Sequence, residues 1–107
     1  MDKISLNDGG DVMRYGVRME LPGVTQEQYD QMHAHFGPLA AAAQGFVAHI
    51  SGPTAGGWYM TEVWESKAHF DRFMQEQVFP SMPPDAPRPA IQDFEVYDRQ
   101  TKDQFHA

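Results

Sequence analysis

The chain begins its ordered pattern with alternating apolar and polar positions. From Val12 to Glu20 the even positions include charged side chains, and the odd positions carry the apolar residues Met13, Tyr15, Val17 and Met19. A repeat of two residues places successive side chains on opposite faces, as in a half-buried strand. The sequence Leu21-Pro22-Gly23 ends this strand, because proline lacks an N–H and glycine admits positive φ.

A helical repeat follows over residues 25–43. One face of this segment collects the apolar residues Tyr29, Met32, Phe36, Leu39, Ala40 and Ala43, which is the spacing of an amphipathic helix. Thr25 is the predicted N-cap, with Gln28 as its capping-box partner. Pro38 lies inside the segment and is expected to kink the helix or to end it and seed a short second turn.

The second half of the chain predicts a hairpin, a helix and a last strand. Residues 46–51 and 58–65 are rich in β-forming residues, and the glycine-rich segment 52–57 forms the turn between them. Ser66 is the predicted N-cap of a helix whose apolar face is formed by Phe70, Phe73, Met74 and Val78. The proline-rich segment 81–89 cannot continue this helix. It leads to a strand over 90–98.

The predicted order is therefore β-α-β-β-α-β. Right-handed crossovers turn this order into an α+β, ferredoxin-like fold, in which a four-stranded antiparallel sheet carries two helices on one face. We assign residues 12–98 to this single domain and residues 1–11 and 99–107 to polar tails. The other sheet face is not fully polar, so we expect a second copy to cover it in a homodimer.

The composition of the chain limits the classes of partner that it is expected to bind. The chain has 107 residues, a formal net charge of −7 and no cysteine. The acidic balance disfavours nucleic acid and membrane surfaces as partners. The lack of cysteine removes thiolate chemistry and suits a cytoplasmic protein. We expect no secretory signal and no membrane span, since the beginning of the sequence holds no apolar run.

The segment GPTAGGWYMTEVWESKAHFDRF, and within it the step Val63-Trp64-Glu65-Ser66, resembles the dimeric α/β-barrel superfamily. The closest likeness is to its antibiotic biosynthesis monooxygenase-like group. The resemblance implies a homodimer that binds an aromatic substrate between sheet and helices, with Trp64 lining the pocket and no cofactor or metal. Heme-degrading relatives carry a histidine in the later half of the second helix. Residues 74–79 hold none, so heme degradation is disfavoured.

Two residues are candidates for catalysis. His49 lies within a predicted strand, where a neutral imidazole can act as a general base; the alternative is an inert histidine facing solvent or the dimer. Glu62 shares its face with apolar neighbours, and a desolvated carboxyl can serve as a second acid or base. Its alternative is an ion pair with Arg14 or Arg18.

The register of the hairpin decides whether the two candidates meet. If His49 lies opposite Met60, it shares a face with Glu62. If it lies opposite Thr61, the two side chains point to opposite faces, because a slip of one residue inverts a strand. The sequence leaves both registers open.

The candidates for substrate binding are mainly aromatic, and each has an ordinary place in a core as its alternative. They are Trp64, Tyr15, Trp58, Met60 and His69. We predict no metal site, because His33 and His35 lie about 200° apart on a helix and cannot chelate together.

The sequence therefore predicts a small homodimeric enzyme that acts on an apolar aromatic or polyketide-like molecule. Cofactor-independent monooxygenation is the favoured reaction. A polyketide cyclase or isomerase using acid-base catalysis is one alternative, and a non-catalytic small-molecule-binding or stress-related dimer is the other.

Overall fold

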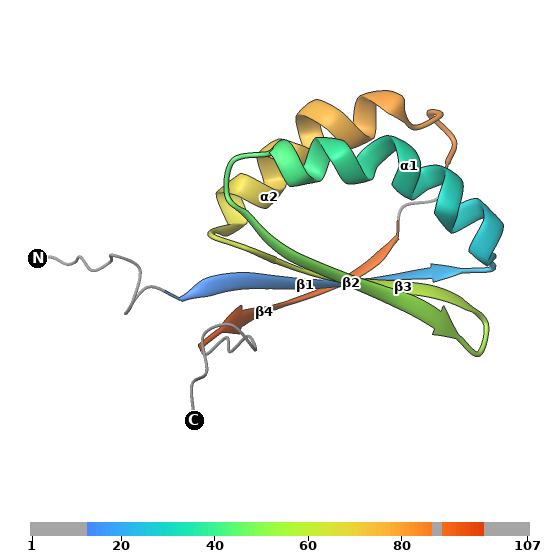
Figure 1. The fold of residues 1–107 in the computed structure, drawn as a ribbon, viewed down its shortest axis with the longest axis horizontal. Coiled ribbons are helices and arrows are strands. Elements are labelled where there is room, and N and C mark those ends of the chain that lie inside the picture. The colour runs from blue at the N-terminus through green and yellow to red at the C-terminus, as the bar shows by residue number, and fades with distance from the viewer. Residues whose placement is uncertain (1–12, 87–88, 98–107) are drawn as a thin grey trace, which may run out of the picture.

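The computed structural model of the chain describes residues 13–86 and 89–97. Within these residues one antiparallel sheet of four strands has the order β2-β3-β1-β4. Its strands are β1 (Arg14–Pro22), β2 (Phe46–Thr54), β3 (Gly57–Trp64) and β4 (Ala90–Val96). Helices α1 (Gln26–Ala42) and α2 (Lys67–Phe73) lie together on one side of it (Figure 1). The predicted ferredoxin-like architecture is confirmed, whereas the expected tails, 1–11 and 99–107, lie outside the described residues.

Helix α1 begins with the predicted capping box. The Thr25 hydroxyl accepts a hydrogen bond from the Gln28 N–H at 3.2 Å, and the Gln28 side chain accepts one from the Thr25 N–H at 3.0 Å. The helix does not end at Pro38 but runs on to Ala42. It can do so because Leu39 and Ala40, just beyond the proline, pack against the hydrophobic core.

The hairpin differs from its prediction in two ways. Strand β2 continues through Gly52 and Pro53, and the turn is shorter than 52–57. Proline is tolerated here because β2 is an edge strand. The register also differs from both alternatives, because His49 pairs directly with Glu62. This pairing continues without a break from Thr54 and Gly57 at the turn, so the length of the turn sets it. A bulge follows only between Phe46 and Ala48.

Helix α2 begins at Ser66, as predicted, where the hydroxyl accepts a hydrogen bond from the His69 N–H. It passes directly into a π-helical turn, η1 (Met74–Val78), and then a 3-10 turn, η2 (Phe79–Ser81). A π-helical turn shifts the side chains that follow it, and such turns are frequent at functional sites. Met74 and Val78 of η1 face the interior beneath the helices.

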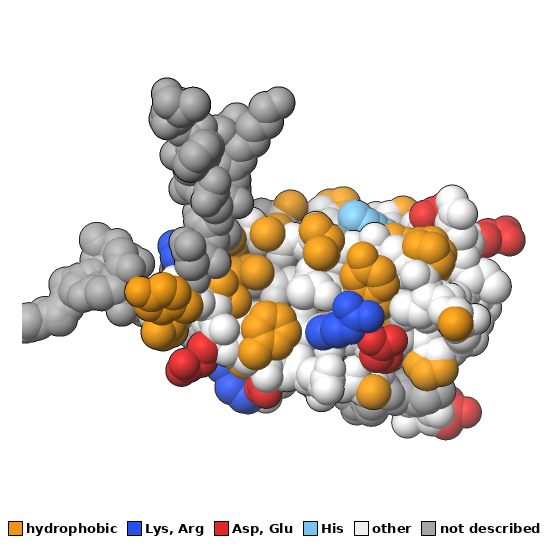
Figure 2. All heavy atoms as spheres, turned by 90° about the horizontal axis from the view of Figure 1, so that it is seen from below, with side chains coloured by type: hydrophobic (Ala, Val, Ile, Leu, Met, Phe, Trp, Pro, Cys, Tyr) orange, Lys and Arg blue, Asp and Glu red, His pale blue; other side chains and the backbone are white. Residues whose placement is uncertain are grey.

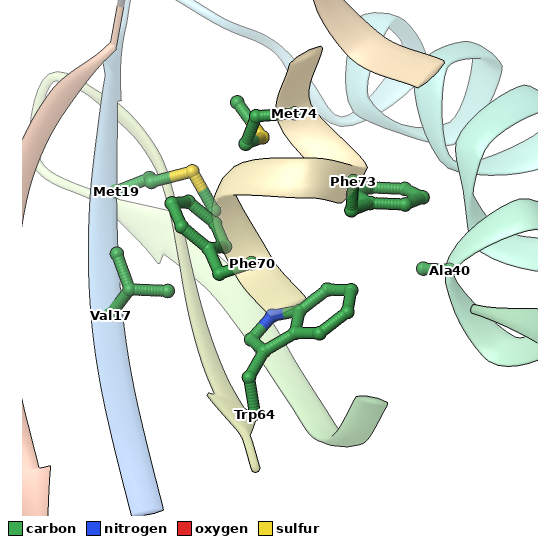
Figure 3. Close-up of a cluster of buried hydrophobic side chains, with 7 residues drawn as sticks. All are labelled: Val17, Met19, Ala40, Trp64, Phe70, Phe73 and Met74. Carbon is green, nitrogen blue, oxygen red and sulfur yellow. The ribbon is translucent and has the colours of Figure 1, made fainter. Parts of the chain in front are cut away.

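A cluster of aromatic side chains fills the interior beneath α2, which we call the packed end (Figure 3). Trp64 is fully buried at its centre. The Trp64 ring lies 6.0 Å from that of Phe70 and 5.3 Å from that of Phe73, measured between centroids. Val17 closes the cluster from β1 and is also fully buried. This region is the tightly packed core of the domain.

Among the described residues, no helix covers the other side of the sheet (Figure 1), and this side shows apolar side chains scattered among polar ones (Figure 2). Ile50 and Phe94 are 61% and 45% exposed. Near the middle, Arg18 lies 4.5 Å above the Tyr59 ring and 2.7 Å from the Glu20 carboxylate. We call this surface the open face.

The arginines of β1 lie on the open face, away from Glu62. Arg18 pairs with Thr61, whereas Glu62 pairs with Val17, and neighbouring positions on a strand point to opposite sides. The alternative that Glu62 forms an ion pair with Arg14 or Arg18 is therefore wrong. Glu62 instead points toward the helices.

Candidate functional site

A cavity of about 590 Å³ lies between the sheet and the helices, next to the packed end. Its wall is mostly apolar and includes Met32 and Phe36 from α1, Met60 from β3, Val78 from η1 and Met82. The predicted apolar face of α1 therefore lines an open space for part of its length. The volume is in the range of small-molecule sites, roughly 300–1,000 Å³.

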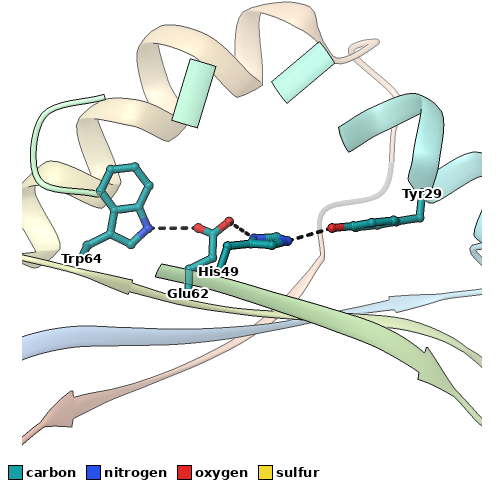
Figure 4. A network of polar contacts seen from close by, with 4 residues as sticks. All are labelled: Tyr29, His49, Glu62 and Trp64. Atoms are coloured by element: carbon teal, nitrogen blue, oxygen red, sulfur yellow. Dashed lines mark hydrogen bonds and ion pairs between the residues drawn. The ribbon is translucent and has the colours of Figure 1, made fainter. Parts of the chain in front are cut away.

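A line of hydrogen-bonded side chains runs from the packed end to this cavity (Figure 4). The Trp64 indole N–H donates to Oε1 of Glu62 at 3.0 Å. Oε2 of Glu62 lies 2.9 Å from Nδ1 of His49, and Nε2 of His49 lies 2.7 Å from the Tyr29 hydroxyl. Tyr29, His49 and Glu62 all line the cavity, whereas Trp64 is not among its lining residues.

Glu62 is a buried carboxyl with both oxygens bonded. It is 7% exposed, and its two partners come from the packed end and from β2. Burying a carboxylate without hydrogen-bond partners would destabilise the fold by several kcal/mol. The hydrogen bonds with Trp64 and His49 supply those partners and fix the position of the Glu62 carboxyl. Glu62 in turn fixes the orientation of the imidazole.

Tyr29 is held in place by rings on two sides. Its ring stacks on Trp58 at 5.3 Å and an interplanar angle of 23°. His33 meets the Tyr29 ring edge-on at 5.5 Å and the His49 ring edge-on at 5.4 Å. His33 is exposed and lines the cavity as well as a shallow groove on the outer side of α1 and β2. The polar end of the cavity is thus a rigid group of aromatic and imidazole rings.

The structure brings together part of the set of site residues predicted from the sequence. His49, Glu62 and Met60 line the cavity. Trp64 reaches the site through its bond to Glu62, and Trp58 lies against Tyr29. Neither tryptophan is among the residues that line the cavity.

Tyr15 and His69 lie apart from this group. The Tyr15 hydroxyl donates to Asp93 at 3.0 Å, and the ring lies 5.6 Å from Phe70. Burial raises the pKa of Tyr15 to about 12, and the hydrogen bond to Asp93 and the charge of that carboxylate add to the shift. His69 lies 2.7 Å from the Ser66 hydroxyl at the start of α2. Neither residue lines the cavity.

Tyr29 is the site residue that the sequence analysis assigned only to an apolar helix face. The available signal was its hydroxyl, because the other residues of that face are aliphatic or phenyl side chains. A buried tyrosine hydroxyl usually has a hydrogen-bond partner. The identity of that partner, His49, depends on how α1 packs over the sheet and could not be deduced from spacing.

In residues 13–86 and 89–97, no three side chains of the metal-binding types gather closely enough to hold an ion. No helix in that part of the chain is both long and apolar enough to span a membrane.

Several solved structures share the fold. A protein of unknown function from Nitrosomonas europaea is 14% identical, with a TM-score of 0.64 and coverage of 85% of this chain and 96% of that one. A heme-degrading protein from Mycobacterium tuberculosis, in heme-free form, is 18% identical, with a TM-score of 0.57 and coverage of 84% and 98%. A mutant of SnoaB, a cofactor-independent oxygenase from Streptomyces nogalater, is 16% identical, with a TM-score of 0.53 and coverage of 86% and 97%.

No family profile and no curated protein matches the chain by sequence. At these identities the structural likeness shows the fold. It agrees with the fold that the resemblance of the segment around Trp64 implied, a four-stranded antiparallel sheet with two helices.

Proposed function

We propose that this protein is an enzyme that binds an apolar aromatic or polyketide-like molecule in the cavity and removes a proton from it. The observation that carries the proposal is the Glu62–His49 pair at the wall of a mostly apolar cavity of about 590 Å³. A histidine oriented by a carboxylate is a general base suited to neutral pH. The cysteine-free composition suits a cytoplasmic enzyme.

The favoured reaction is cofactor-independent monooxygenation of an electron-rich phenol. The phenol loses its proton to the site, which leaves His49 protonated, and the resulting phenolate reacts with O₂ at a ring carbon. The peroxide anion takes that proton back and becomes a hydroperoxide. Loss of water from the hydroperoxide and the ring C–H leaves a quinone. One oxygen atom enters the product, the other leaves as water, and the substrate provides all four electrons. The fold shared with SnoaB, a cofactor-independent oxygenase, supports this choice.

Two other functions would use the same cavity. A cyclase or isomerase would begin with the same proton transfer and need no oxygen. A binding protein would hold the aromatic molecule without changing it. The two alternatives and the oxygenase differ in oxygen consumption and in product, so one assay separates them.

The test is an oxygen-electrode assay with tricyclic and tetracyclic phenols, together with mass spectrometry of the product made under ¹⁸O₂. We expect one O₂ consumed and one ¹⁸O atom gained per quinone formed. His49→Gln is expected to lower kcat by roughly 10²–10⁴-fold, as for loss of a general base. His35→Gln, at an exposed position of α1, is the matched control and keeps the wild-type rate.

Each alternative has its own outcome. Equal product formation under strict anaerobiosis would contradict the oxygenase and support the cyclase or isomerase. Binding of the phenols without any product would support the non-catalytic protein.

We also propose that the protein is a homodimer that buries the open face. Ile50 and Phe94 are exposed there, and β4 exposes every residue except Val96. Such a surface on a domain of this size is typical of an interface.

Sedimentation velocity tests the homodimer. We expect a dimer for the wild type and about a 100-fold weaker one for Ile50→Glu, because a two-fold interface repeats each substitution and each lost apolar contact costs about 1.5 kcal/mol. Gln75→Glu, on the exposed surface of η1, is the control. A monomeric wild type would contradict the dimer.

A further inference from the structure

Both ring nitrogens of His49 already have partners within the protein. Nδ1 lies 2.9 Å from Glu62 and Nε2 lies 2.7 Å from the Tyr29 hydroxyl. A substrate in the cavity therefore does not meet a free nitrogen of this histidine. The atom beyond Nε2 is the hydroxyl oxygen of Tyr29. Tyr29 is one of the residues that line the cavity. A hydroxyl that donates its one hydrogen still has lone pairs to accept another.

We propose, building on the function above, that Tyr29 is the residue that takes the substrate proton and that His49 and Glu62 act through it. The O–H bond of the substrate breaks, and its proton bonds to the Tyr29 oxygen while Tyr29 passes its own proton to Nε2 of His49. The electron pair stays on the substrate as a phenolate. His49 becomes an imidazolium beside the Glu62 carboxylate, and the Tyr29 hydroxyl now donates to the phenolate.

The hydrogen bonds of Glu62 set the direction of this relay. The Trp64 indole can only donate, so Oε1 of Glu62 acts as an acceptor. An ionised carboxylate also accepts at Oε2, which places the His49 hydrogen on Nδ1 and leaves the lone pair of Nε2 facing Tyr29. The same order of carboxylate, histidine and hydroxyl activates the nucleophile in hydrolytic triads. In this site it activates an oxygen base.

Tyr29 is fixed well enough to act in this way. Its backbone N–H bonds to the Thr25 carbonyl at 2.9 Å, in the first turn of α1 that the capping box holds. Its ring lies against Trp58 and His33. A pre-positioned acceptor avoids the entropic cost of finding the proton during the reaction.

The position of Tyr29 also restricts the substrate. The molecule must carry an acidic hydroxyl that reaches the Tyr29 end of the cavity, with its flat apolar part along Met32, Phe36 and Met60. A phenol or an enol fused to an aromatic ring system meets both needs. A purely apolar molecule without such a hydroxyl does not.

The first test uses the free protein. Nitrogen-15 NMR of the histidine side chains distinguishes the two imidazole tautomers, and loss of one signal set in His49→Gln assigns His49. We expect the tautomer with hydrogen on Nδ1. Hydrogen on Nε2 in the neutral ring would reverse the bond to Tyr29 and overturn the relay.

The second test uses a dihydroxyanthraquinone dye, a tricyclic phenol whose absorption band moves to longer wavelength when it loses a phenolic proton. The dye is added at a pH where it is neutral in water. We expect the band of the ionised dye with the wild type and its loss with Tyr29→Phe, although the variant still binds the neutral dye. Tyr97→Phe, 86% exposed in the wild type, is the matched control and keeps the ionised band.

The outcomes separate the relay from the proposed function. Both measurements are made without oxygen, so a failed oxygenase assay leaves them unchanged. Ionised dye in Tyr29→Phe but not in His49→Gln would overturn the role of Tyr29 and make His49 the direct acceptor. If the dye does not bind the wild type, the proposal that the cavity binds aromatic molecules is contradicted. The tautomer of His49 then remains the test of the relay.

Discussion

The interior between the sheet and the helices has two ends, of which one is tightly packed and the other contains a cavity. At the packed end, Phe70 and Phe73 of α2 close around Trp64 and leave it fully buried. At the other end, Met32 and Phe36 of α1 remain partly exposed around a cavity of about 590 Å³. Glu62 joins the two ends, with one oxygen bonded to Trp64 and the other to His49. We infer that packing at one end carries the stability and permits an open, mostly apolar cavity at the other.

The largest expected effect is at the packed end. Trp64→Ala should lower the free energy of unfolding by about 3–5 kcal/mol, because it leaves a large hole and removes a bond from buried Glu62. Urea denaturation measures the loss. Met32→Ala, at the other end, is the comparison and should cost clearly less, because its side chain already borders open space. Equal losses of unfolding free energy in the two variants would contradict the division of the interior into a packed end and a cavity.

A middle-sized effect is expected from filling the cavity. Met32→Trp places an indole in the open space and should weaken binding of a tricyclic phenol at least about tenfold, which is about 1.4 kcal/mol. The free energy of unfolding should change by less than about 1 kcal/mol, since no packed neighbour has to move. Fluorescence titration and urea denaturation give the two values. Met13→Trp, 45% exposed in the wild type, should leave the affinity unchanged.

The smallest expected effect concerns Tyr15, outside the cavity. Its pKa is raised from 10.0 to about 12, so the folded protein holds this proton more tightly than the unfolded chain. The resulting stabilisation is complete below pH 10 and is lost as the pH rises toward 12. Ultraviolet titration should show a late transition that Tyr15→Phe removes and Asp93→Asn moves to lower pH. The same late transition at full amplitude in Tyr15→Phe would contradict the assignment.

The features that local pattern determines could be predicted from the sequence. The period of two in β1, the capping box at Thr25 and the N-cap at Ser66 are encoded by neighbouring residues, and each is present. Together they determine the order of elements and hence the ferredoxin-like fold. The predicted hairpin turn begins too early, at Gly52, because glycine and proline are common turn residues. The edge strand β2 accommodates both residues.

The site depends on contacts between distant residues and could be predicted only in part. Residue type identifies His49 and Glu62 as candidates, but the short turn between Thr54 and Gly57 decides that they face each other. Tyr29 is 20 residues from His49 in the sequence, and its helix spacing is that of any core residue. Trp64 was expected to line the pocket, whereas Phe70 and Phe73 enclose it at the packed end.

The most direct test of the cavity as a binding site uses the methionines. Met32, Met60 and Met82 line the cavity, whereas Met13 is 45% exposed outside it. Carbon-13 methyl NMR of labelled methionine can follow all four while the dihydroxyanthraquinone is added. We expect shifts of Met32, Met60 and Met82 with a common saturation curve and no shift of Met13. Unchanged signals from Met32, Met60 and Met82, or a shift confined to Met13, would contradict binding in the cavity.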